Sequence, residues 1–505
     1  RKEPFLWLYS TQDKEKIISV SIDKFKKVFG APPLSVGSYH MDNVSMKLLK
    51  QISPQTKITI GGCFEEGVKV FHGCNNSWYL FNEGMPFFPW YPSLNNTLVP
   101  AKDESDWEGI VAVPHLSRDL ALSYEGRNDF FASHPANVQR AMANEGSTAP
   151  YTFNLLDMYR FQERYNDGFS YTNVFVGPGW LSGNPNVQDS DEVTQNMYRE
   201  YLEYFAELKS TGELTDMYMG EFADWFKSHV EIGKPQRYFA KEILYGSGKH
   251  YFWYIDSQMR VTFDMEQGGS IGDFRPFCAH QERHTGRDCE SLAMASNPYL
   301  IHSQYRSGNS YHYADGARTT LLLEHDDEVI DLCDYKTKIL DLDSKQGETV
   351  LTLTPVTIQF KSGLFVTLKT VYRILDNGEL FISSELLEIS DETASIKATE
   401  YFKGCYGVTE YPENLKGILL QVKGKEEKSL VFDYSSEEIF VEDAEYVSAQ
   451  IPQLDMSVKL LKADAGEHIA EAIDGYLFSP FYTLKLSGKL SKGKEMCSCL
   501  KITKL

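Results

Sequence analysis

The sequence predicts an α/β fold in which an N-terminal seven-stranded (β/α) barrel is followed by an all-β sandwich domain. In the first half, short apolar runs that resemble strands alternate with helical segments, which is typical of βαβ units and a parallel sheet. From about residue 316 the helical period disappears and one strand-like run follows another. At 505 residues the chain is also too long for one ordinary core, so at least two domains are expected.

Polar, ionisable or aromatic residues follow the ends of the strand-like runs that make up the predicted barrel. These runs are Leu6–Ser10, Leu34–Tyr39, Ile58–Cys63, Ile110–Pro114, Asn173–Gly177, Asp216–Gly220 and Tyr251–Ile255. In a (β/α) barrel the chemistry lies at the carboxyl ends of the strands. We therefore expect functional side chains directly after these runs.

Helical segments are predicted between the runs. The longest covers Asp191–Ser210, where aromatic and leucine side chains recur at i, i+3 and i+4 spacing and form one apolar stripe. Shorter helices are predicted at Ser21–Phe29, Pro135–Asn144 and Asn154–Tyr165. Such stripes are most simply faces that pack on a sheet.

The C-terminal part is predicted to be a β-sandwich. The expected strands are Thr319–Leu323, Lys338–Leu342, Glu348–Leu353, Leu364–Ile374, Leu380–Leu387, Gly417–Val422, Ser429–Tyr434, Val458–Leu461, Tyr482–Leu486 and Met496–Thr503. Asp376-Asn377-Gly378 is a strong hairpin turn signal between two of them. The predicted domains are therefore a barrel at 1–265, a linking segment at 266–315 and a sandwich at 316–505.

Charge and missing motifs exclude several classes of function. The formal net charge of −21 argues against nucleic acids and anionic membrane surfaces as partners, because phosphate binding needs Lys and Arg patches. No apolar run is long enough for a transmembrane helix. Phosphate-binding loops, dinucleotide fingerprints and the serine nucleophile elbow are missing too, so nucleotide-dependent chemistry and serine hydrolysis are disfavoured.

Carboxylates at the predicted strand ends form the first candidate site. Glu221 and Asp256 each follow an apolar run with aromatic neighbours, and an apolar setting raises the pKa of a carboxyl group, as an acid catalyst requires. Glycoside hydrolysis needs two such groups on either side of the scissile bond. Asp42 and Glu65 are competing candidates. In the alternative interpretation, Glu221 caps a following helix and Asp256 pairs with Arg260.

Aromatic side chains form the second candidate site. The loop at 78–91 is rich in rings and prolines and carries Trp78, Trp90 and Tyr91, which are expected to stack on sugar rings or to plug the barrel mouth. Trp180 and Trp225 are expected to line the same cleft. At the end of the fourth run, His115 and Arg118 are expected to bind substrate, although Arg118 can also pair with Asp119.

The third candidate is a metal centre. His40 and Asp42 lie two residues apart at the end of the second run, so both side chains can reach one cation such as zinc. Glu65 or His115 would complete the ligand set. The alternative is a hydrogen-bonded histidine beside a turn aspartate, in which case the protein needs no cofactor.

A strand–helix barrel followed by a large β-sandwich resembles glycoside hydrolase families 38 and 57 and their polysaccharide-deacetylase relatives. His40-Met41-Asp42 is similar to the zinc-binding His-x-Asp of family 38, where that motif follows the first strand rather than the second. Asp256 is similar in place to the carboxylate near the seventh strand of family 57. The chain also resembles a secreted two-domain Bacteroidetes family of unknown function.

These observations favour a carbohydrate-active hydrolase with Glu221 and Asp256 as its carboxylate pair. Its expected partners are oligo- or polysaccharides, and the expected location is periplasmic, cell-surface or extracellular. Two alternatives stay open. One is a metal-dependent carbohydrate deacetylase or hydrolase built on His40, Asp42 and His115, and the other is a glycan-binding protein without enzymatic activity.

Overall fold

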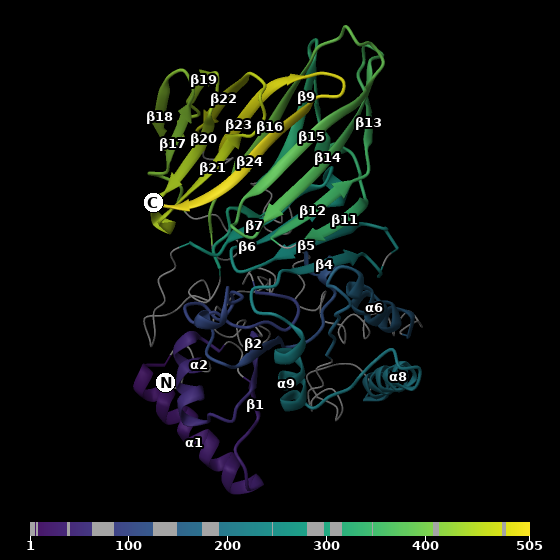
Figure 1. Cartoon of the computed structure of the whole chain (residues 1–505), viewed down its shortest axis with the longest axis vertical. Helices are drawn as coiled ribbons and strands as arrows, with labels where there is room; N and C mark the ends of the chain where they lie inside the picture. Colours follow the sequence, from purple (N-terminus) through teal and green to yellow (C-terminus); the bar gives the residue numbers. More distant parts are fainter. Residues whose placement is uncertain are drawn as a thin grey trace. The chain divides into compact units, whose positions relative to one another are not determined.

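The structure is a computed structural model, shown in Figure 1. It describes residues 6, 9–37, 41–62, 85–124, 149–173, 191–244, 246–279, 297–302, 316–345, 347–407, 414–476 and 481–505. The chain divides into two compact units. The first takes residues 1–248 and 282–296, and the second takes 249–281 and 297–505.

A parallel sheet forms the centre of the first unit. It consists of β1 (Ser35–Gly37), β2 (Ile58–Gly62) and β3 (Val111–Pro114), in that order. Ser35 pairs with Ile58, which in turn pairs with Val111. These strands confirm three of the predicted runs. All four residues of β3 are buried, as expected of a parallel strand that is covered on both faces.

Helices are the other main regular elements among the described residues of this unit. They are α1 (Thr11–Phe29), α2 (Asn43–Ile52), α4 (Leu120–Tyr124), α6 (Ala149–Phe161), α8 (Asp191–Ser210) and α9 (Met219–His229), with the short turns η3 (Glu104–Asp106) and η4 (Gln162–Arg164) and the strand β4 (Gln236–Lys241). The bounds of α8 are those predicted from its apolar stripe. The predicted helix at 135–144 lies outside the described residues.

The predicted closed barrel is not found among the described residues, and two of its strands are wrong. Leu6 lies in a helical turn and Ser10 caps α1, so that run is not a strand where it is described. Residues 216–218 are irregular and Met219 already begins α9. The buried residues of α9 are Gly220, Ala223 and Phe226, which are three apart, as on one face of a helix. This helical pattern outweighs the alternation in 216–220 that predicted a strand.

The run Tyr251–Ile255 is a strand, but it does not belong to a parallel sheet. It lies in β5 (His250–Ile255), which pairs antiparallel with β6 (Met259–Asp264), and Ile255 pairs with Arg260. Only three residues connect the two strands. A parallel connection needs a crossover of a dozen residues or more, so a tight turn at this point dictates a hairpin.

The second unit is antiparallel. After β5 and β6 come β7 (Ser270–Pro276) and β8 (Ile301–His302), which continue the same sheet. A six-stranded sheet has the order β10-β9-β16-β23-β22-β19, and a ten-stranded sheet contains β11, β12, β13, β14, β15, β17, β18, β20, β21 and β24.

All ten predicted runs overlap strands of these two sheets, whereas β10, β13, β16, β19, β20 and β22 were not predicted. The strands of the two sheets are β9 (Arg318–His325), β10 (Glu328–Asp331), β11 (Ile339–Lys345), β12 (Glu348–Leu353), β13 (Val356–Gln359), β14 (Phe365–Leu375), β15 (Leu380–Ile389), β16 (Ile396–Gly404), β17 (Leu419–Lys423), β18 (Glu427–Val431), β19 (Glu438–Glu442), β20 (Tyr446–Ile451), β21 (Met456–Lys462), β22 (His468–Ile473), β23 (Tyr482–Leu490) and β24 (Glu495–Lys504). The predicted hairpin joins β14 to β15, and Gly378 adopts a positive φ of 83° there.

The two large sheets share one core. Leu321 and Ala398 of the six-stranded sheet lie in the same buried cluster as Val366 and Leu386 of the ten-stranded sheet. This packing confirms a β-rich second region with two apolar faces turned toward each other.

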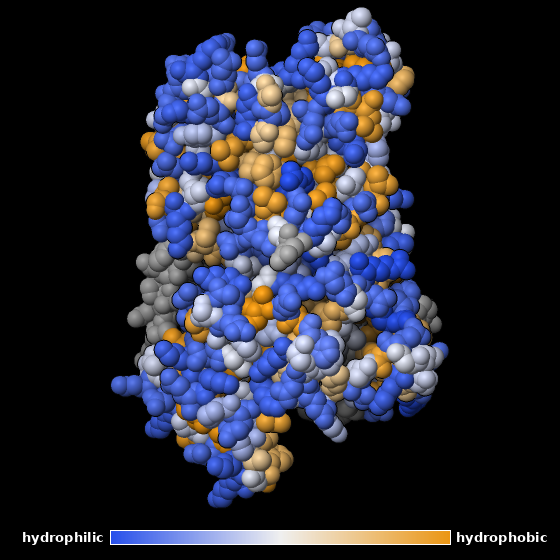
Figure 2. Space-filling view, viewed as in Figure 1, coloured by the Kyte–Doolittle hydropathy of each residue, from blue (hydrophilic) through white to orange (hydrophobic). Residues whose placement is uncertain are grey.

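The surface is mostly hydrophilic in the view of Figure 2. Hydrophobic colour gathers at the carboxyl-terminal end of α1, where Phe25, Val28 and Phe29 are exposed. No described helix is both long and apolar enough to cross a membrane.

Candidate functional site

The candidate site is built around the last turn of α9. Glu221 stabilises the first turn of this helix, because its carboxylate accepts a hydrogen bond from the Tyr218 backbone N–H at 3.1 Å. Ala223 and Phe226 pack on β2 and β3 in one buried cluster. Trp225 and His229 lie one turn apart on α9 and leave part of their surfaces accessible.

The segment after residue 85 supplies the inner wall. Trp90 exchanges two backbone hydrogen bonds of 2.9 Å with Ala112 of β3, and its indole N–H donates to the Thr97 carbonyl at 2.9 Å. The neighbouring Tyr91 hydroxyl donates to the Val230 carbonyl at 2.7 Å, directly after α9. Burial raises the pKa of Tyr91 to about 12, so this hydroxyl remains a donor at neutral pH.

A loop after η4 supplies the opposite wall. Its Asn166 is buried and clamps the loop to β4, because its side chain accepts from the Arg237 N–H at 2.8 Å and donates to the Arg237 carbonyl. Asp167 follows with a φ of 52° and Gly168 with a φ of 83°, which turns the chain sharply. Asp167 pairs with Lys234 at 2.9 Å.

Gln236 joins these two walls. Its amide nitrogen donates to the Pro89 carbonyl at 2.7 Å, and its amide oxygen accepts from the Phe88 N–H at 3.3 Å. Both ends of the amide are therefore used to hold the aromatic segment in place. This side chain shapes the site rather than offering a free polar group to a ligand.

The rings on α9 form a stack. The imidazole of His229 lies on the indole of Trp225 with centroids 4.5 Å apart and planes 13° apart. Phe169 stacks on the same indole at 5.7 Å. Trp225 is thus held in one orientation by rings from its own helix and from the loop after η4.

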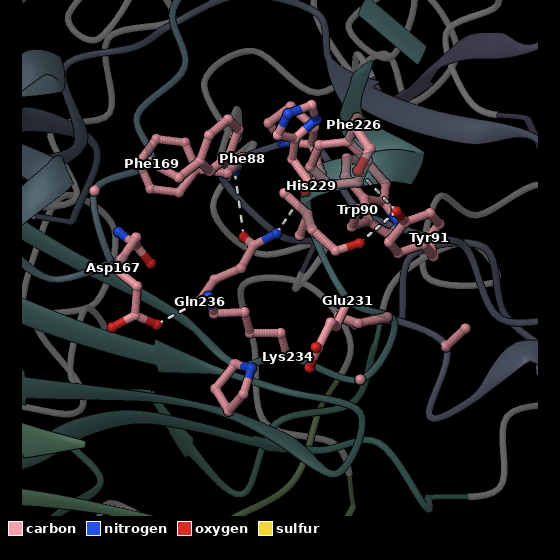
Figure 3. A pocket seen from close by; sticks show the side chains of 18 of the residues that line it. Phe88, Trp90, Tyr91, Asp167, Phe169, Phe226, His229, Glu231, Lys234 and Gln236 are labelled. Carbon is pink, nitrogen blue, oxygen red and sulfur yellow. Dashed lines mark hydrogen bonds and ion pairs between the residues drawn. The ribbon is translucent and has the colours of Figure 1, made fainter. Parts of the chain in front are cut away.

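Together these elements enclose a cavity of ≈ 260 Å³, here named the α9 pocket. Its lining residues are Phe88, Pro89, Trp90, Tyr91, Pro100, Ala101, Asn166, Asp167, Gly168, Phe169, Trp225, Phe226, His229, Val230, Glu231, Gly233, Lys234, Pro235 and Gln236. Figure 3 shows the rings gathered along one side of the pocket, and Asp167, Lys234 and Glu231 along the other. The pocket therefore has an aromatic side and a charged side.

Three contacts place α9 near the amino-terminal edge of the parallel sheet. Gly220 faces Leu34, Asp224 pairs with Lys57, and the Lys227 ammonium donates to the Gly109 carbonyl at 3.1 Å. Leu34, Lys57 and Gly109 each precede one of the three strands by one or two residues. The α9 pocket thus lies near the edge of the sheet where the strands begin. The barrel pattern had predicted functional side chains at the opposite edge, where the strands end.

A larger, more open groove of ≈ 1040 Å³ borders the pocket. It shares Gly168, Phe169 and Trp225 with the pocket and continues along α6, η4 and α8. Arg160 of the groove pairs with Asp157 at 2.9 Å, while the Arg164 guanidinium lies 4.5 Å from the centre of the Phe161 ring. The shared residues form a common wall between the two hollows.

The structure brings three of the predicted aromatic residues together. Trp90, Tyr91 and Trp225 all line the α9 pocket. Trp90 and Tyr91 are nevertheless only 2% and 5% exposed, so they serve mainly as the packed back wall. Of these three rings, Trp225 keeps an accessible surface.

The two predicted carboxylates have local structural roles. Glu221 is exposed on the first turn of α9 and caps it, as the alternative interpretation expected. Asp256 is 3% exposed and accepts from the Gln258 and Met259 N–H groups and the Tyr254 hydroxyl at 2.7, 2.8 and 3.0 Å. Burial raises the pKa of Asp256 to about 6. Arg260 pairs with Asp273 at 3.0 Å.

Asp42 is held in a buried ion pair. Its carboxylate lies 2.9 Å from the Lys14 ammonium and also caps α2 by accepting from the Val44 and Ser45 N–H groups at 3.1 and 3.2 Å. The Ser45 hydroxyl donates to its second oxygen at 2.6 Å. Both carboxylate oxygens of Asp42 are therefore engaged in holding α1 and α2 together.

At the carboxyl end of β3, His115 and Arg118 are partly buried. Their backbone carbonyls accept from the Asn173 side chain at 2.9 Å and from the Tyr159 hydroxyl at 2.9 Å. Asp119 is 2% exposed and accepts from the Tyr151 hydroxyl at 3.0 Å. These contacts fix the turn after β3 to α6.

Four predicted site residues lie outside the described residues: His40, Glu65, Trp78 and Trp180. In the part of the chain that is described, no group of three or more His, Cys, Asp or Glu side chains could hold a metal ion. A zinc centre at His40 and Asp42 therefore remains a prediction.

Sequence reasoning missed the charged side of the pocket. His229, Glu231 and Lys234 lie in the last turn of α9 and the loop after it, which the barrel pattern did not emphasise. One signal could have found His229. Trp225 and His229 are four residues apart, so once 219–229 is read as a helix they must lie on the same face.

No protein-family model matches the sequence, and no curated protein matches it. Among solved structures, the fold is similar to a candidate glycoside hydrolase/deacetylase from Parabacteroides distasonis, with 12% identity, a TM-score of 0.44, and coverage of 58% of this chain and 67% of that chain. It is similar to the 4-alpha-glucanotransferase of Thermococcus litoralis, with 10% identity, a TM-score of 0.32, and coverage of 100% and 86%. A galactose mutarotase-like protein from Clostridium acetobutylicum has 9% identity, a TM-score of 0.32, and coverage of 53% and 99%.

Proposed function

We propose that this protein is carbohydrate-active and that the α9 pocket binds one ring of a glycan. The observation that carries the proposal is the two-sided lining, with aromatic rings on one side and charged groups on the other. A pyranose has the matching character, because its C–H face is apolar and its rim carries hydroxyl groups. Binding sites in general combine an aromatic lining with a few polar groups that fix orientation.

The polar groups of the pocket suit hydroxyl recognition. Glu231 offers two acceptor oxygens, and the Lys234 ammonium keeps donor capacity beyond its contact with Asp167. The His229 Nδ1 lies 2.8 Å from the Trp225 carbonyl, which can only accept. Nδ1 therefore donates, and in the neutral ring Nε2 is an acceptor. A sugar hydroxyl group can donate to Glu231 or to Nε2 of His229, and it can accept from Lys234.

The size of the pocket favours a single sugar ring. Sites that bury drug-sized ligands have volumes of roughly 300–1,000 Å³. The α9 pocket, at ≈ 260 Å³, lies just below that range. The neighbouring groove of ≈ 1040 Å³ gives a longer glycan room to continue past Phe169 and Trp225.

A glycan array tests the binding proposal. The wild type should bind a defined subset of glycans, and Trp225→Ala should lose that binding. Tyr218→Ala is the matched control, because Tyr218 is an 83% exposed ring beside the same helix that does not line the pocket. Binding that is equal in both variants would contradict the proposal.

Hydrolysis by a carboxylate pair is the second candidate function. Its support is the pKa of Asp256, which burial raises to about 6, within the range of carboxyl groups that act as general acids. Glycan-library hydrolysis with Glu221→Gln and Asp256→Asn tests this function. Turnover that survives a chelator and is lost in both variants supports the pair. Turnover lost to the chelator would instead support the metal site predicted at His40 and Asp42.

A further inference from the structure

We infer that the α9 pocket selects sugars that carry a free amino group, and that Glu231 is the residue that determines this specificity. The inference rests on the proposed sugar binding and adds the chemical class of the ligand. It follows from the charges of the lining residues and from the electrostatics of aromatic rings.

The cations beside the pocket are already neutralised. Lys234 lies 2.9 Å from Asp167, and Arg237 approaches the same carboxylate at 4.0 Å from the buried side of the loop. The positive charge of Lys234 is thus shared with a fixed partner. An anionic sugar that enters the pocket would have to compete with Asp167 for it.

Glu231 has no such partner. Within the described part of the chain it makes no hydrogen bond or ion pair, and its side chain is exposed at the pocket. It is therefore the lining carboxylate whose charge is available to a ligand. A cationic group placed beside Glu231 gains an ion pair, whereas a carboxylate or sulfate there is repelled.

The aromatic side of the pocket also favours a cationic group on the ligand. The faces of aromatic rings carry negative electrostatic potential and attract cations within about 6 Å. Phe169 lies on the side opposite Glu231 in Figure 3. Phe169 and Trp225 are lining rings that keep part of their surfaces accessible. An ammonium group on a bound sugar would therefore be stabilised by the rings on one side and by Glu231 on the other.

A series of sugars that differ only at C2 tests the inference: glucose, glucosamine and N-acetylglucosamine, titrated at neutral pH. Because an exposed ion pair and an exposed cation–π contact are each modest, we expect glucosamine to bind about tenfold more tightly than glucose. N-acetylglucosamine, which lacks the charge, should lose this advantage. The advantage should also shrink at high salt, since Glu231 is exposed to solvent.

Glu231→Gln should reduce the preference for glucosamine over glucose to less than about twofold. The amide keeps one acceptor oxygen for a hydroxyl group but has no charge, so glucosamine should lose more affinity than glucose. Glu207→Gln is the matched control, because Glu207 is an exposed helical carboxylate that lines neither hollow. Equal binding of glucose and glucosamine by the wild type would overturn the inference and leave the proposed function intact. If none of the three sugars binds, the inference fails too, and the glycan array with Trp225→Ala decides the proposed function separately.

Discussion

The imidazole of His229 lies flat on the indole of Trp225, with 4.5 Å between the ring centres and 13° between the planes. Two contacts fix this arrangement, because Nδ1 of His229 lies 2.8 Å from both the Trp225 carbonyl and the Ser228 hydroxyl. The stack turns the end of α9 into a rigid wall of the pocket. Rigid aromatic surfaces lose little conformational entropy when a ligand binds, which favours recognition.

Two substitutions of His229 separate its role as a ring stacked on Trp225 from its role as a hydrogen-bond acceptor. His229→Phe keeps a ring on Trp225 but removes the Nε2 acceptor, so we expect sugar affinity to fall several-fold, as for one lost hydrogen bond of about 1 kcal/mol. His229→Ala should weaken binding further because Trp225 loses its neighbour. Calorimetric titration measures both effects, and unchanged thermal unfolding of His229→Phe is the control. Full affinity in His229→Ala would contradict this account.

The groove should extend recognition beyond one ring. Arg164→Ala removes the cation that lies over Phe161 in the groove and leaves the α9 pocket untouched. We expect weaker binding of oligosaccharides, by a few-fold, and no change for a monosaccharide. Competition between oligosaccharide and monosaccharide, followed by ligand-observed NMR, measures this difference. Equal losses for both ligands would show that the groove does not take part.

Asp42 should be important for stability. Asp42→Ala leaves the Lys14 ammonium buried without its carboxylate, which typically costs about 3–5 kcal/mol, and it removes the cap of α2. Urea unfolding measures the loss. Combining it with Lys14→Met should restore most of the stability, because the unpaired charge is gone. Asp103→Ala, which removes the exposed cap of η3, is the control and should cost much less stability than Asp42→Ala.

Asp256 should make stability depend on pH. Its pKa is about 6 in the folded protein against an ordinary value of 3.8, so the folded state keeps its proton where the unfolded state has lost it. The resulting stability is present below pH 3.8 and is lost as the pH rises through 6, by up to about 3 kcal/mol. The Asp256→Asn protein should not show this loss of stability as the pH rises. Unfolding of both proteins between pH 4 and 8 tests it, and parallel profiles would contradict the burial argument.

Gly61 should tolerate no side chain. A Cβ at this position would lie 2.6 Å from the Trp90 indole and 2.9 Å from the Ala112 methyl group. Gly61→Ala must displace the packed back wall of the α9 pocket, so we expect a loss of about 1–3 kcal/mol together with weaker sugar binding. Gly37→Ala in β1 is a useful comparison, because Gly37 has no positive φ and its Cβ would first meet the flexible end of the Ile60 side chain, at 3.1 Å. A fully stable Gly61→Ala protein would be inconsistent with this packing.

Local patterns predicted much of the fold. Strands such as β14 alternate buried residues with more exposed ones along their whole length, so period-two reading located them well. Strands such as β16, which is buried at most of its positions, lack this alternation and were missed. The sequence of Asp216–Gly220 also alternates, but α9 begins within this run. Glu221 lies three residues after Tyr218, which is the spacing of a helix cap. The predicted seventh barrel strand failed for another reason. Nothing in Tyr251–Ile255 itself shows whether its neighbour is parallel, and the short turn at Asp256 decides it.

The candidate site was harder to predict than the fold. Trp90, Tyr91 and Trp225 were found because clustered rings are conspicuous in a sequence. Glu231 and Lys234 were missed, since their importance depends on the loop at Asp167 folding against the end of α9 from a distant part of the chain. Long-range contacts of this kind leave no periodic pattern in either segment.

Calorimetric titration of the wild type and Trp225→Ala with the best glycan from the array tests the central claim most directly. The account predicts saturable one-site binding by the wild type, at least a tenfold loss in Trp225→Ala, and unchanged affinity in Tyr218→Ala. Circular dichroism of each variant confirms that the fold is retained. Wild-type affinity in a folded Trp225→Ala protein would contradict the claim that the α9 pocket binds the sugar.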